Sequence, residues 1–190
     1  QMQTRPDDLK SAGFEVRFKP VLEAGGDFYD VFEIYGGHGF FVADICGHDL
    51  GAAFGTAGLK ALLTQNATPV FTPEETLRNM NEVWRSMLWG GGNHLTACHA
   101  LLNSNRRKLK VLCCGHQGPI LVKADGKPQI LQSEGDILGV FEHLHLQALE
   151  VKVSPGDRFF LFTDGLVERN GDSILPRSMG TQRLIQILND

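Results

Sequence analysis

The sequence has few cysteines, and none is spaced for a metal or redox motif. The four cysteines of this 190-residue chain are Cys46, Cys98, Cys113 and Cys114. No two of them are separated by two residues, the spacing of zinc knuckles and thiol redox motifs. Their apolar neighbours favour buried free thiols in a reducing cytoplasm. A reactive Cys46 is the alternative, and it would require a lowered thiol pKa.

Long apolar runs and an excess of basic charge are also absent. No apolar stretch approaches the roughly 18 residues of a spanning helix, and the polar start at 1–10 has no signal-peptide core. The 18 basic and 22 acidic residues give a net charge of −4, which disfavours nucleic acid as a partner. Neither a Gly-x-Ser-x-Gly elbow nor a Gly-x-x-x-x-Gly-Lys loop occurs, so acyl transfer and P-loop nucleotide hydrolysis have no support. We expect a cytoplasmic protein that binds neither nucleic acid nor membrane.

What is present is the composition of one folded domain. Apolar residues make up 42% of the chain and charged residues 21%, which argues against disorder throughout. The chain does not begin with Met. We therefore expect a piece of a longer protein, with a linker over 1–13 and one domain over 14–190.

Strands outnumber helices in the hydrophobic pattern. Alternating apolar and polar residues predict a strand over 14–19, and a hairpin of 27–34 and 40–44 is expected around a turn at Gly36–Gly39. Further strands are predicted over 95–103, 108–114, 119–124, 128–132, 145–153 and 158–163. Helices are predicted over 50–65, from a capping box at Thr72–Glu75, and over 182–188. This order favours two packed sheets with helices outside rather than alternating βαβ units.

Three aspartates stand beside glycines at the ends of predicted strands: Asp27, Asp44 and Asp164. Each alone could be a turn residue or a helix cap. If they converge, their mutual repulsion raises their pKa values unless a cation keeps them ionised. Oxygen ligands select Mg²⁺ or Mn²⁺, and two such ions can activate a water and clamp a phosphate. Zinc is disfavoured because no set of His or Cys accompanies the aspartates.

Four motifs occur in order along the chain: Glu23-Ala-Gly-Gly-Asp27-Phe-Tyr-Asp30, Val42-Ala-Asp44-Ile-Cys-Gly-His48, Cys114-Gly-His-Gln-Gly-Pro119 and Phe162-Thr-Asp164-Gly-Leu-Val-Glu168. With them the chain resembles the PPM-type (protein phosphatase 2C-like) serine/threonine phosphatases, in the bacterial branch of SpoIIE and RsbU. The resemblance covers roughly residues 14–188. It implies an α+β fold, an α-β-β-α sandwich of two central antiparallel sheets with a metal site at one end.

The resemblance also implies roles for individual residues. Asp27, Asp44 and Asp164 match the family's catalytic metal-ligand aspartates, with Asp44 bridging two Mg²⁺ or Mn²⁺ ions and the backbone carbonyl of Ile45 joining it. The residues expected around these ligands are Gly47, His48, Asp49 and Gly165. Asp49 replaces the branch's usual Gly. Its two possible roles are the N-cap of the 50–65 helix and an outer contact to the metal.

A further ligand aspartate of the family lies on a C-terminal strand, in an Asp-Asp-x-Thr-like motif. The sequence stops at Asn189-Asp190, so that role is not carried over to Asp190. Either the strand lies outside this sequence or this member has lost one ligand. The second case would weaken one of the two metal sites.

Several other residues have a structural and a functional interpretation. His116 either hydrogen-bonds a backbone carbonyl or contacts substrate, and Asp30 either supports the metal ligands or points to solvent. Surface positions are expected for His94 and His99 and for the charged run Arg106-Arg107-Lys108. The pair His143 and His145 is also expected on the surface, although its spacing could bind a metal.

The sequence thus predicts a metal-dependent phosphoserine/phosphothreonine protein phosphatase. The resemblance implies a phosphorylated anti-sigma-factor antagonist as substrate, an upstream sensor or receiver domain of the response-regulator type in the same chain, and partner-switching control of sigma factors. A homodimer would fit this branch. The alternative is a degenerate phosphatase domain that acts as a non-catalytic binding or adaptor module.

Overall fold

The fold is a four-layer sandwich, seen in a computed structural model that describes residues 13–19, 25–46, 50–87, 94–170, 173–174 and 176–189. The main sheet has the order β1-β2-β3-β4-β9 and the second sheet the order β10-β5-β6. Two two-stranded ladders, β7-β8 and β11-β12, accompany them. The five strands of the main sheet are β1 (Asp27–Ile34), β2 (Gly37–Ile45), β3 (Leu95–Leu102), β4 (Lys108–Cys114) and β9 (Leu149–Lys152).

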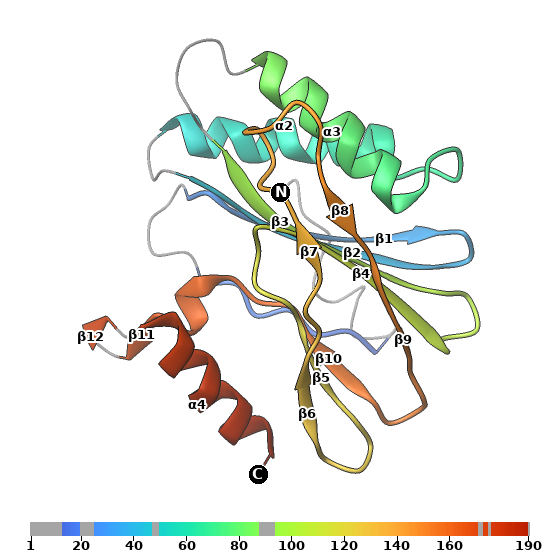
Figure 1. The fold of residues 1–190 in the computed structure, drawn as a ribbon, viewed down its shortest axis with the longest axis vertical. Coiled ribbons are helices and arrows are strands. Elements are labelled where there is room, and N and C mark those ends of the chain that lie inside the picture. Colours follow the sequence, from blue (N-terminus) through green and yellow to red (C-terminus); the bar gives the residue numbers. More distant parts are fainter. Residues whose placement is uncertain are drawn as a thin grey trace.

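The remaining elements are shorter strands and the helices. The strands are β5 (Ile120–Val122), β6 (Pro128–Ile130), β7 (Glu134–Gly135), β8 (Leu146–Gln147), β10 (Arg158–Phe160), β11 (Arg169–Asn170) and β12 (Ser173–Ile174). The helices are α2 (Leu50–Asn66), α3 (Pro73–Met87), α4 (Arg177–Asn189) and the short 3₁₀ helix η1 (Asp164–Leu166). In Figure 1, α2 and α3 lie over the main sheet, and α4 lies beside the second sheet.

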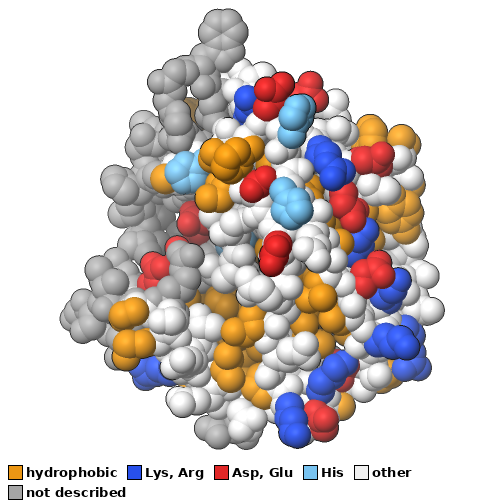
Figure 2. Space-filling view, in the orientation of Figure 1, with side chains coloured by type: hydrophobic (Ala, Val, Ile, Leu, Met, Phe, Trp, Pro, Cys, Tyr) orange, Lys and Arg blue, Asp and Glu red, His pale blue; other side chains and the backbone are white. Residues whose placement is uncertain are grey.

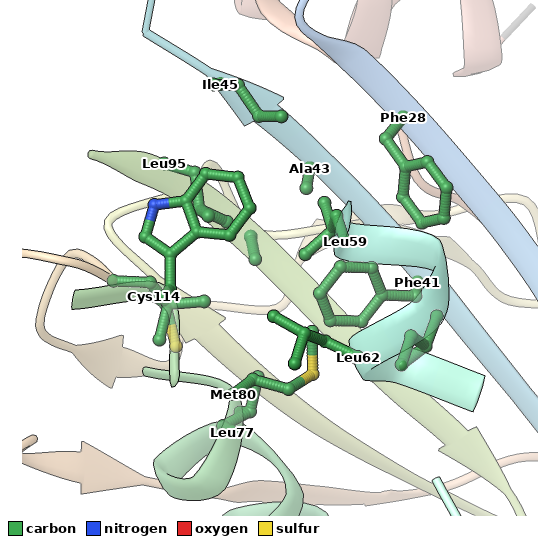
Figure 3. Close-up of a cluster of buried hydrophobic side chains, with 14 of the residues drawn as sticks. Phe28, Phe41, Ala43, Ile45, Leu59, Leu62, Leu77, Met80, Leu95 and Cys114 are labelled. Carbon is green, nitrogen blue, oxygen red and sulfur yellow. The ribbon is translucent and has the colours of Figure 1, made fainter. Parts of the chain in front are cut away.

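Three apolar clusters hold the layers together. The first joins the main sheet to α2 and α3 and includes Phe41, Leu59 and Met80 (Figure 3). The second fills the space between the two sheets, and the third joins the second sheet to α4. This arrangement confirms the predicted α-β-β-α sandwich, because each sheet buries one face on the other sheet and one face on helices.

Local signals in the sequence account for the two helices over the main sheet. Glu75 accepts a hydrogen bond from the Thr72 backbone amide (2.7 Å), and the Glu75 amide donates to the Thr72 hydroxyl (3.2 Å), so the predicted capping box begins α3. A Cβ at Gly55 of α2 would lie 3.0 Å from the Ile45 side chain and 3.2 Å from the Trp84 ring. The small residue therefore allows α2 to pack closely on β2 and α3.

Three local predictions were wrong. Residues 14–19 join no strand ladder. The turn of the first hairpin lies at Tyr35-Gly36 rather than at Gly36–Gly39, because β2 already begins at Gly37. The predicted strand over 158–163 ends at Phe160, and the chain then turns into η1.

The cysteine interpretation is confirmed for three of the four residues. Cys98, Cys113 and Cys114 are buried free thiols, and Cys46 is exposed. Cys98 and Cys113 are opposite each other on β3 and β4, with their sulfurs 3.8 Å apart. Burial raises the pKa of Cys114 to about 12, as expected for an inert core thiol.

Asp30 and His99 lie in the interior rather than on the surface. Asp30 is buried and forms an ion pair with Lys60, which fastens β1 to α2. His99 is also buried, beside the rings of Phe32 and Phe41. His143 and His145 are exposed, as predicted.

No continuous basic area appears on the face drawn in Figure 2, where Lys and Arg side chains are interspersed with Asp and Glu. Within the described ranges, every helix is too short or too polar to cross a lipid bilayer.

Burial of His99 should make the fold sensitive to acid. Burial is the main cause that lowers its pKa to about 4, while Glu74 raises the pKa and Lys110 lowers it. The folded state then binds this proton less readily than the unfolded state, so the contribution of His99 to stability is present above pH 6.5 and is lost as the pH falls toward 4.

We therefore expect His99→Leu to reduce the acid sensitivity. Between pH 7.5 and pH 5 the wild type should lose about 2 kcal/mol more of its free energy of unfolding than the variant. Urea unfolding across this pH range measures the difference. Parallel losses in both proteins would contradict a neutral buried His99.

Candidate functional site

The first hairpin sets two of the predicted aspartates opposite each other. Tyr35 and Gly36 both have positive φ, 54° and 67°, as in the tight two-residue turns that suit the twist of a hairpin. This turn pairs Ile34 with Gly37, and the same register pairs Asp27 with Asp44. Directly opposite residues of an antiparallel pair point to the same face, with Cβ atoms about 5 Å apart. Asp27 and Asp44 are therefore neighbours at the end of the hairpin.

These two aspartates face the second sheet. Phe40 of β2 and Val31 of β1 both pack in the cluster between the sheets. Asp44 and Asp27 each lie four residues from one of them on the same strand, so they share that face. Thr96 of β3 pairs with Asp44 and extends the polar row across a third strand. The row thus lies at one end of the gap between the sheets.

Gly26 allows the hairpin to close at this end. The Ile45 amide donates a 3.0 Å hydrogen bond to the Gly26 carbonyl. A Cβ at Gly26 would lie 2.2 Å from the Ile45 carbonyl oxygen, the atom predicted to join the metal ligands. Any larger residue must therefore move that carbonyl or separate the strands.

The second sheet supplies Asp164, through the segment that follows β10. Asp164 opens η1, and the preceding residue Thr163 occupies the N-cap position without using its side chain as a cap. The Thr163 side chain instead hydrogen-bonds Asp27 across the gap between the sheets. The segment 161–164 is thereby joined to the end of the first hairpin.

The electrostatics of Asp27 reflect this crowding. Its pKa is raised, chiefly by burial and further by the negative charge of Asp164, while the hydrogen bond from Thr163 lowers it. All three aspartates are half-buried. An ionised carboxylate in such surroundings is stabilised by a cation, because the cation offsets both the desolvation and the repulsion between like charges.

The donor set fits a hard divalent cation in its chemistry. It offers carboxylate oxygens from two sheets and the Ile45 carbonyl, which are the oxygen ligands that Mg²⁺ and Mn²⁺ prefer. Within the described residues, however, no three His, Cys, Asp or Glu side chains are already grouped closely enough to hold an ion. Asp27 is thus the common neighbour of Asp44 and Asp164, and a closed ligand set would require the carboxylates to approach one another.

Of the other predicted site residues, Gly165 is exposed in η1. Gly47, His48 and Asp49 lie outside the described residues. Asp30 belongs to the opposite face of β1 from Asp27, because it pairs with Lys60 of α2.

Two residues of the site, Thr96 and Thr163, were not predicted from the sequence. For Thr163, its place directly before Asp164 is the one available signal.

A cavity of about 910 Å³ opens beside Asp27 and Thr163. The main sheet, residues 14–18 and the chain around β10 line it. β10 is an edge strand of the second sheet, so the cavity lies along a sheet edge and reaches Asp27, one of the three site aspartates.

Replacing Gly26 should therefore damage the fold where Gly25 tolerates the same change. For Gly26→Ala we expect a loss of about 2 kcal/mol in the free energy of unfolding, because the new Cβ overlaps the Ile45 carbonyl. Gly25→Ala is the matched control, since a Cβ there meets no atom within 4 Å. Urea unfolding compares the two, and equal stabilities would contradict the close approach.

Comparison with known proteins shows which family this chain belongs to and which folds it resembles. The family model described as Stage II sporulation protein E (SpoIIE) matches residues 35–190, a range that includes Asp44 and Asp164 but not Asp27. The phosphoserine phosphatase RsbP of Bacillus subtilis (strain 168) is 22% identical over 150 residues, which cover 77% of this chain. The chain spans only 37% of the length of RsbP.

Solved structures show the same fold. The SiaA-PP2C domain of Pseudomonas aeruginosa superimposes with a TM-score of 0.81 at 24% identity, over 97% of this chain and 75% of that one. RsbX, solved in complex with magnesium, gives a TM-score of 0.65 at 18% identity, over 90% of this chain and 83% of that one. Because the SpoIIE family model matches most of this chain, residues 35–190, the chain belongs to the SpoIIE family.

Proposed function

We propose that this domain is a Mg²⁺- or Mn²⁺-dependent phosphoserine/phosphothreonine protein phosphatase. The observation that carries the proposal is that Asp27 has two other aspartates, Asp44 and Asp164, as neighbours at one end of the sandwich. Asp44 is paired with Asp27 across the hairpin. The negative charge of Asp164, which follows β10 of the second sheet, raises the pKa of Asp27. This concentration of negative charge beside an open cavity is what a cation-dependent phosphate site requires.

In this proposal Asp27, Asp44, Asp164 and the Ile45 carbonyl hold the cations. Bound Mg²⁺ or Mn²⁺ would supply an activated water and neutralise the charge of the phosphate. Thr163 orients the Asp27 carboxylate through its hydrogen bond. Gly26 keeps the Ile45 carbonyl at the same end. We retain Gly47, His48, Asp49 and Gly165 as residues around the ligands, and two ions as the number bound.

The substrate we propose is a phosphorylated protein, such as an anti-sigma-factor antagonist in a partner-switching pathway of the cytoplasm. The similarity to RsbP, a phosphoserine phosphatase, supports this choice. Since the chain spans 37% of RsbP, we also propose that a sensor or receiver domain precedes residues 14–190 in the complete protein. A homodimer is compatible with that arrangement.

The cavity offers a place for the C-terminal strand that carries the family's additional ligand aspartate. The edge of β10 and residues 14–18 line the cavity from two sides, and neither takes part in a further strand pairing among the described residues. We propose that the family's Asp-Asp-x-Thr-like strand would pair there if the complete protein carries it. The assay below therefore uses the complete protein.

The alternative is a domain that recognises its partner without turning it over. The observation in its favour is that the described carboxylates do not form a ready group of three. Binding of a phosphopeptide without Mn²⁺-dependent release of phosphate would support this alternative.

We expect the complete protein to release phosphate from a phosphoserine peptide when Mn²⁺ is added. Asp44→Ala should lower the rate by about 100-fold or more, because it removes the aspartate proposed to bridge the two ions. Glu33→Ala is the matched control, since Glu33 is an exposed carboxylate near the far end of the same hairpin. Phosphate release measured against Mn²⁺ concentration tests both.

Two outcomes would contradict the proposal. Absence of Mn²⁺-dependent turnover by the wild type would exclude the enzyme. Equal rates for the wild type and Asp44→Ala would remove Asp44 from the site.

A further inference from the structure

His116 connects the two sheets directly behind the candidate site. Its Nδ1 lies 2.8 Å from the hydroxyl of Thr96, the residue paired with Asp44 on the main sheet. Its Nε2 lies 3.0 Å from the carbonyl oxygen of Phe162, in the segment that leads to Asp164. The ring is buried, so these hydrogen bonds are shielded from water and their loss would be costly.

The partners of His116 fix its tautomer in the neutral state. The Phe162 carbonyl can only accept, so Nε2 must carry the proton and donate it. Nδ1 is then an acceptor, and the Thr96 hydroxyl donates to it. Gln117 donates a second hydrogen bond to the same carbonyl, at 2.9 Å. The Phe162 carbonyl is thus held by two side chains of one turn.

Gly115 brings His116 to this position. It follows β4 with a φ of 64°, in the left-handed region, and a Cβ there would lie 2.3 Å from the Ile137 side chain. Only glycine satisfies both conditions without strain. The chain can therefore turn sharply at the end of β4 and place the imidazole between the sheets.

We propose that His116 is a positioning residue, which holds the Phe162–Asp164 segment against the Asp27–Asp44 pair and so sets the cation affinity of the site. Phe162 directly precedes Thr163, which hydrogen-bonds Asp27, and Asp164, whose charge acts on Asp27. Asp164 can join a shared cation only if this segment stays close to the main sheet. The inference rests on the proposed function, because it assumes that the three aspartates bind one cation centre.

The test measures Mn²⁺ affinity directly, by isothermal titration calorimetry on the complete protein without substrate. We expect His116→Leu to weaken Mn²⁺ binding by about 10- to 100-fold, as for residues that orient metal ligands. His116→Gln should restore affinity to within about threefold of the wild type, because an amide can both accept from Thr96 and donate to Phe162. His143→Leu, at an exposed histidine, is the control and should leave the affinity unchanged.

The outcomes separate this inference from the proposed function. Unchanged affinity in His116→Leu, with binding lost in Asp44→Ala, would overturn the inference alone. Unchanged affinity in Asp44→Ala would overturn the proposed metal site and the inference together. If His116→Leu does not fold, Thr96→Val decides: severalfold weaker binding supports the inference, and wild-type binding overturns it.

Discussion

The two-residue turn at Tyr35-Gly36 is the constraint on which the rest of the site depends. It fixes the register of β1 and β2, and a shift by one residue would turn every side chain of one strand to the opposite face. Asp27 would then leave the gap between the sheets, and Asp30 would leave Lys60 of α2. One short turn therefore determines both the acidic face of the hairpin and its attachment to the helix layer.

The site also needs the second sheet, which the hairpin alone cannot position. Apolar packing between the sheets brings them together without strict direction, because hydrophobic burial is not directional. The hydrogen bonds of Thr163 to Asp27 and of His116 to Phe162 fix how the segment after β10 is placed relative to the main sheet. A few buried and half-buried polar contacts, added to a large apolar core, thus place Asp164 near Asp27.

Much of this could be predicted from the sequence, for physical reasons that differ between elements. The two strands around a glycine-rich turn and the capping box of α3 are local signals, and the β1–β2 hairpin and the capped helix both appear in the structure. The burial of Asp30 and His99 could not be predicted, because it depends on Lys60 and on Phe32 and Phe41 from other elements. Residues 14–19 carry an alternating pattern, yet a strand also needs a partner edge, and no pattern within the segment reveals one. That Asp27 would lie near both Asp44 and Asp164 could likewise not be predicted from their spacing in the sequence, because the pairing of strands and the packing of the two sheets bring them together.

The most direct test of a cation centre shared by the two sheets is a crystal structure of the complete protein with Mn²⁺, located by its anomalous scattering. We expect an anomalous peak between Asp27, Asp44 and Asp164, coordinated by oxygens from both sheets. A peak bound elsewhere, or one that Asp164 does not reach, would contradict a cation centre shared across the two sheets.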